Sequence, residues 1–84
     1  MKQNTNSLKK QIDEIALAKG FYKSEYKKEN CLSNFRDPVL PLIISVYATS
    51  GTVGVSYDKK PFKWYKKCSI EQIKKIFENP IKYS

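Results

Sequence analysis

Apolar residues recur at helical spacing near the N-terminus of the chain. They fall on one face of an α-helix and therefore predict a helix over about residues 6–19. This stripe consists of Leu8, Ile12, Ile15 and Ala16. Gly20 follows at the position where a left-handed residue commonly ends a helix, and Thr5, Asn6 or Ser7 is available as the N-terminal cap.

A second helical stripe lies near the C-terminus and predicts a helix over about residues 70–79. Its members are Ile70, Ile73, Ile76 and Phe77. Ser69 precedes the stripe, and Gln72 follows three residues later, which is the spacing of a capping box. Pro80 ends the helix because proline cannot continue it.

Between these helices, β-branched and aromatic residues predict three strands, over about residues 42–49, 52–57 and 62–67. A two-residue turn at Ser50-Gly51 would fix the register of the first two strands. The expected pairs are Thr49 with Thr52, Ala48 with Val53, Val46 with Val55, and Ile44 with Tyr57. The last three pairs are apolar or aromatic and share one face.

The segment "DKKP" is expected to turn the chain into the third strand. Pairing Tyr57 with Phe62 would place Trp64 opposite Val55, on the apolar face. Lys63, Tyr65 and Lys67 would then lie on the other face of the sheet. That second face would also carry Ile43, Ser45, Tyr47, Thr52, Gly54 and Ser56.

Residues 21–41 carry no clear periodicity and are expected to be irregular, since Pro38 and Pro41 exclude a helix interior around them. The whole pattern predicts a single α+β domain over residues 1–84. It has two layers, with an N-terminal helix, a three-stranded antiparallel meander and a C-terminal helix packed on the apolar face of the sheet. Which face the N-terminal helix covers stays open.

Gly51 and Gly54 raise the question of a phosphate-binding loop. Such loops usually open a helix and present successive backbone N–H groups to the anion. Here both glycines are flanked by strand-forming residues, and no Walker-type lysine-serine pair follows them. The sequence favours a hairpin in which Gly51 serves the turn and the ring of Tyr47 covers Gly54.

The charge of the chain points to a polyanionic partner. Fifteen lysines and one arginine oppose eight acidic residues in 84 positions, which gives a net charge of +8. Lysine suits phosphate contact, whereas bidentate reading of guanine prefers arginine. We therefore expect nucleic acid, DNA or RNA, held with weak sequence specificity. Codon bias in an AT-rich genome is the competing explanation for the excess of lysine.

The candidate binding residues lie on and around the second face of the sheet. Lysines would neutralise phosphates, and tyrosine rings would stack bases. The set is Tyr47, Lys59, Lys60, Lys63, Tyr65, Lys66 and Lys67. In the competing interpretation the N-terminal helix covers this face and buries the tyrosines, while the lysines protect an edge strand from aggregation.

Other functions receive less support from the sequence. The chain has no histidine, so the common acid–base and triad arrangements are absent, and the two cysteines have no metal-binding spacing. We expect no enzyme activity, no cofactor and no metal. The alternatives are a protein-interaction module, for example a small viral or plasmid-borne factor that binds a host protein or self-associates, and a histidine-free endoribonuclease. The latter would resemble the RelE-like toxins in length and charge. No apolar signal segment or membrane span is evident, which predicts an intracellular protein.

Overall fold

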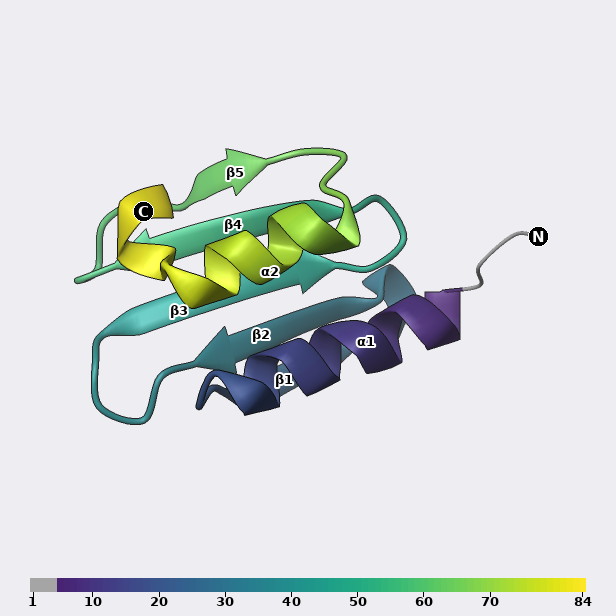
Figure 1. The fold of residues 1–84 in the computed structure, drawn as a ribbon, viewed down its shortest axis with the longest axis horizontal. Helices are drawn as coiled ribbons and strands as arrows, with labels where there is room; N and C mark the ends of the chain where they lie inside the picture. The colour runs from purple at the N-terminus through teal and green to yellow at the C-terminus, as the bar shows by residue number, and fades with distance from the viewer. Residues whose placement is uncertain (1–4) are drawn as a thin grey trace.

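The computed structural model describes residues 5–84 of the chain (Figure 1). The structure is α+β, with helices at both ends of the chain and an antiparallel sheet between them, as predicted. The sheet has five strands in sequential order rather than three. The elements are α1 (Thr5–Ala18), β1 (Tyr22–Lys27), β2 (Leu32–Arg36), β3 (Leu42–Tyr47), β4 (Thr52–Tyr57), β5 (Lys63–Tyr65) and α2 (Ile70–Glu78), with short 3-10 turns η1 (Lys28–Asn30) and η2 (Pro80–Tyr83).

The ends of the helices follow from local chemistry. Gly20 has a φ of 84°, and the N–H of Phe21 donates to the carbonyl of Ala16 at 2.9 Å, so the predicted glycine stop of α1 is confirmed. The candidate caps, residues 5–7, lie outside the side chains that the structure describes. At α2, the hydroxyl of Ser69 accepts from the backbone N–H of Gln72, which confirms the predicted N-terminal cap.

The prediction that residues 21–41 are irregular is wrong, because β1 and β2 form a hairpin there. All six residues of β1 are exposed, so the strand is held by backbone pairing and leaves no alternating apolar pattern in the sequence. Only the following connection is irregular, and both prolines lie in it. The carboxylate of Asp37 accepts from the N–H groups of Val39 and Leu40 there, and these bonds lower the pKa of Asp37.

The hairpin of β3 and β4 exists as predicted, but its turn is longer. Residues 48–51 form the connection, and the N–H of Gly51 donates to the carbonyl of Tyr47 at 2.9 Å. Ile44 therefore faces Val55 rather than Tyr57. This shift of two residues leaves every side chain of β3 and β4 on its predicted face, because side chains alternate with a period of two.

Both α-helices pack side by side on the same face of the sheet (Figure 1). Phe77 of α2 lies at the centre of this layer, where its ring makes edge contacts with Phe21 at 5.2 Å and Phe35 at 5.5 Å. The core consists of Ile12, Ala16, Phe21, Phe35, Leu42, Ile44, Val46, Ala48, Val53, Val55, Ile73, Ile76 and Phe77. Within residues 5–84, the opposite face has no α-helical cover, and we call it the open face.

The turn before β4 packs tightly against the segment before α2 at Gly51, so a substitution there should be destabilising. Gly51 has a φ of 70°, and a Cβ atom there would lie 2.9 Å from the carbonyl oxygen of Cys68. Gly51→Ala should therefore cost about 2–3 kcal/mol, since backbone strain and a backbone clash combine. Gly20→Ala is the matched control, because that glycine also has positive φ but open space around it, and should cost about 1 kcal/mol.

Urea unfolding of the two glycine variants checks this prediction. The midpoint should fall further for Gly51→Ala than for Gly20→Ala at equal m-value. Equal losses would mean that the backbone of Cys68 does not confine Gly51.

Candidate nucleic-acid interface

The strand β5 decides which side chains share the open face. Gly54 pairs with Trp64, and Val53 pairs with Tyr65, so the register differs by one residue from the predicted one. Asp58 and Lys59 both have positive φ, and the N–H of Lys60 donates to the carbonyl of Tyr57, which makes a tighter turn than the expected four-residue one. A one-residue change moves every side chain of the strand to the other face.

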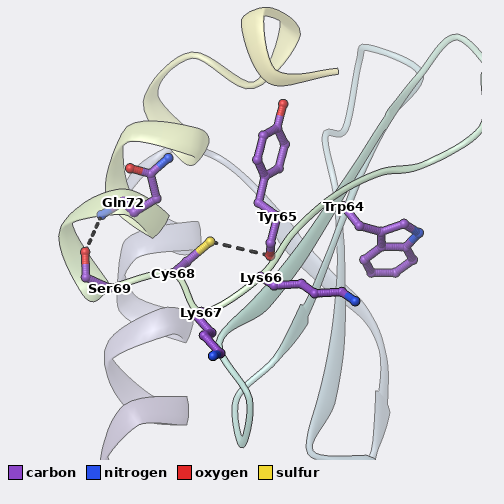
Figure 2. Close-up of a pocket in the computed structure, with 7 residues that line it drawn as sticks. All are labelled: Trp64, Tyr65, Lys66, Lys67, Cys68, Ser69 and Gln72. Atoms are coloured by element: carbon purple, nitrogen blue, oxygen red, sulfur yellow. Dashed lines mark hydrogen bonds between the residues drawn. The ribbon is translucent and has the colours of Figure 1, made fainter.

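The predicted placement of Tyr65 beside Tyr47 is therefore wrong. Tyr65 lies on the helix side of β5, where its hydroxyl donates to the carbonyl of Tyr83 at 2.8 Å and its ring contacts the ring of Tyr83. Figure 2 shows Tyr65 and Trp64 projecting from opposite sides of the chain. Tyr65 anchors η2 to the sheet. It is not available for stacking on the open face.

Trp64 takes the place on the open face that Tyr65 was expected to occupy. Its six-membered ring fills the space above Gly54, where a Cβ atom would come within 2.5 Å of Trp64 Cζ3. Trp64 therefore covers this glycine. The expected cover by Tyr47 is wrong, because Tyr47 pairs with Thr52. Only glycine at position 54 leaves room for the indole.

Three rings gather at this point on the open face, and we call them the aromatic platform: Tyr47, Phe62 and Trp64. Phe62 stacks on Trp64 with centroids 5.4 Å apart and planes inclined by 27°, and Tyr47 lies 6.0 Å from Trp64. Trp64 remains 46% exposed and Phe62 36% exposed, while Tyr47 is half-buried. The predicted position of Tyr47 on the second face is confirmed.

The centre of the open face is polar and internally hydrogen-bonded. Ser45 donates to Asn34 Oδ1, and Asn34 Nδ2 donates to Glu25 Oε1 at 3.1 Å, which links β3, β2 and β1. Ser56 donates to the carbonyl of Lys60 at 2.6 Å, so the connection between β4 and β5 is fixed against the edge of this face. These bonds fix the positions of the strands and of the connection next to the aromatic platform.

The predicted lysines surround β5 but do not share one face. Lys59 and Lys60 precede the strand, and Lys66 and Lys67 follow it; all four are exposed. Lys66 extends to the same side as Trp64 (Figure 2). Lys63 is opposite Val55, on the helix side, so its predicted position on the second face is wrong.

Among residues 5–84, three lysines elsewhere are paired with carboxylates, whereas the five lysines around β5 are not. Lys9 and Lys23 both approach Asp13, and Lys19 approaches Glu78, at N–O distances between 3.0 and 3.6 Å. In the part of the chain that the structure describes, no carboxylate lies within ion-pair distance of the lysines around β5. The charges of Lys59 and Lys60 before β5, and of Lys66 and Lys67 after it, are therefore directed to solvent.

A depression of about 490 Å³ lies where β5 leads into α2 (Figure 2). Its lining residues are Trp64, Tyr65, Lys66, Lys67, Cys68, Ser69 and Gln72. The thiol of Cys68 lies 3.5 Å from the carbonyl of Tyr65, and burial raises the pKa of this thiol. A raised pKa disfavours the thiolate, so Cys68 is not set up as a nucleophile.

Among residues 5–84, no three cysteine, aspartate or glutamate side chains gather closely enough to hold a metal ion. Neither α1 nor α2 has the length and apolar character needed to cross a bilayer.

The sequence matches no protein-family model, and no curated protein or solved structure is significantly similar to it.

Proposed function

We propose that this protein is a small, non-enzymatic nucleic-acid-binding module that contacts mainly the phosphate backbone. The observation that carries the proposal is the set of unpaired lysines at both ends of the aromatic platform. Phosphates would be held by Lys59 and Lys60 on one side and by Lys66 and Lys67 on the other. At about 3.3 Å per residue, the stretch from Lys59 to Lys67 spans at most about 26 Å of chain, which suits a linear polyanion better than a single small anion.

The charge around another group of exposed apolar residues supports the choice of this surface. Val39 and Leu40, in the connection between β2 and β3, and Ile81 of η2 are also exposed. Lys19, Asp37 and Glu78 line the adjacent depression, so cations and carboxylates are mixed there. Around β5, exposed rings lie among five lysines, and Asp58 is the one carboxylate in residues 58–67, so the net charge there is positive and attracts phosphate.

Weak sequence specificity is part of the proposal. The ammonium group of lysine is a point charge that meets phosphate from many directions, and phosphate contacts carry no sequence information. The single arginine, Arg36, lies on β2 and is separated from β5, which carries Trp64, by β3 and β4. Direct base reading by bidentate arginine is therefore not a feature of this surface.

Two matched pairs of substitutions test the proposal. Lys60→Gln/Lys66→Gln removes one charge on each side of the platform, whereas Lys74→Gln/Lys75→Gln removes the same charge from the exposed side of α2. Each lost phosphate contact should lower the slope of log K against log salt by about 0.7 for a single strand, so the first pair should lower it by about 1.4. The second pair should leave the slope unchanged.

Fluorescence anisotropy over a series of salt concentrations measures these slopes. Equal slopes for both pairs would place the phosphate contacts elsewhere on the protein. Binding that is absent for DNA and RNA alike, or indifferent to salt, would refute the proposed function.

A further inference from the structure

We infer that the partner is an unpaired strand of nucleic acid, whose bases stack on the aromatic platform while the flanking lysines hold its phosphates. The inference rests on the proposed function and adds the class of nucleic acid to it. Its basis is the juxtaposition of Trp64, Phe62 and Tyr47 on the open face with solvent-directed lysines at both ends of β5.

The rings are presented in a way that stacking requires. Nearly half of Trp64 and about a third of Phe62 are exposed, although the indole has an apolar floor at Gly54. Phe62 stacks beside it, so the two side chains form one continuous aromatic surface. An extended surface of this kind gains free energy from any base, because every base has a flat π-face.

Rigidity of the platform also favours binding. Gly54 confines the indole from below, and the partial stacking of Phe62 and the tilted ring of Tyr47 limit its rotation. Aromatic side chains held in place lose little conformational entropy when a ligand arrives. The aromatic platform is therefore preorganised, and its rings do not need to rearrange when a ligand binds.

The geometry selects against a duplex. In double-stranded nucleic acid the faces of the bases are stacked on one another, and only their edges reach the grooves. Exposed rings on a flat sheet can contact those faces only when the bases are unpaired. Lysines around the platform would still contact the phosphates of a duplex, so duplex binding should persist in a weaker form.

The charge of the surface decides against a second copy of this chain as the occupant. A partner with the same +8 charge would be repelled by the lysines around β5. An unpaired strand supplies negative charge through its phosphates and flat surfaces through its bases, which complement the lysines and the rings of this surface. The unpaired strand satisfies both requirements at once.

The test uses the full chain and the emission of Trp64, the one tryptophan of the sequence. The probes are oligothymidylate and oligouridylate of about 12 nucleotides, within the usual range of single-strand site sizes, and the duplexes that they form with their complements. We expect both single strands to bind about 10-fold or more tightly than their duplexes, and to quench Trp64 on binding. Comparison of the two single strands distinguishes DNA from RNA.

The other outcomes separate this inference from the proposed function. Duplexes that bind as well as single strands, or single-strand binding that leaves Trp64 emission unchanged, would overturn the inference while the proposed function stands. Failure of all four probes to bind would overturn both. Trp64→Phe, which keeps an aromatic ring, should retain part of the single-strand preference, and Trp64→Ala should abolish it.

Discussion

Replacing Trp64 with alanine is expected to weaken the binding of an unpaired oligonucleotide by about 5- to 150-fold. This range corresponds to the stacking free energy that one base gains on an aromatic ring. The effect should be large because Trp64 is the centre of the platform, in contact with both Phe62 and Tyr47. Its salt dependence should stay close to that of the original protein, since no charge is removed.

Tyr26→Ala is the matched control for this substitution. Tyr26 is also an exposed ring on an edge strand, but it lies on β1, where its ring contacts Lys9 and Lys23. Anisotropy titrations should give the same affinity for Tyr26→Ala as for the original protein. An unchanged affinity of a folded Trp64→Ala variant, or an equal loss in both variants, would contradict the role of the platform.

Replacing Phe77 with alanine is expected to cost about 3–5 kcal/mol of unfolding free energy. The ring is almost fully buried, and it joins Phe21, which follows α1, to Phe35 of β2. Its loss would leave a cavity at the point where both helices meet the sheet. Such a loss is a large fraction of the stability of a small domain.

Denaturant unfolding monitored by circular dichroism measures this loss. Val39→Ala serves as the control because Val39 is 86% exposed, and it should change the unfolding free energy by less than about 0.5 kcal/mol. A loss below about 1 kcal/mol for Phe77→Ala would mean that α2 does not cover this face of the sheet.

The second half of the fold was predictable because its apolar residues repeat with clear periods. Ile73, Ile76 and Phe77 mark one face of α2, and Val46 and Val55 mark one face of β3 and β4. The predicted turn between β3 and β4 was too short, and this shifted the predicted pairing by two residues. Because side chains alternate with a period of two, each residue was still assigned to the correct face. Periodicity reports which face is buried, and it is insensitive to a shift of two residues.

The first hairpin could not be read from the same signal. The residues of β1 are exposed on both faces, so no alternation of apolar and polar residues marks the strand. Backbone pairing with β2 holds it instead, and its sequence resembles a polar connection. Leu32 and Phe35 of β2 are buried, but two apolar residues are too few to establish a period.

On the second face of the sheet, the sequence prediction placed Tyr65 where the structure has Trp64. Asp58 and Lys59 have left-handed backbone conformations, which glycine usually adopts. Because neither residue is glycine, the sequence does not predict a tight turn there. That turn moves β5 by one residue and exchanges Tyr65 for Trp64 on the open face. Gly54 is the residue from which the position of Trp64 could have been predicted. A glycine within a strand leaves room for a large ring to pack against the backbone.

The most direct measurement maps an unpaired oligouridylate onto the protein by its effects on ¹H–¹⁵N chemical shifts. We expect the indole N–H of Trp64 and the backbone amides of Gly54 and Tyr47 to shift in proportion to bound strand. The amide of Ile73, in the buried face of α2, should stay unchanged. Shifts confined to α1 and α2, with Trp64 and Gly54 unmoved, would contradict the open face as the nucleic-acid interface.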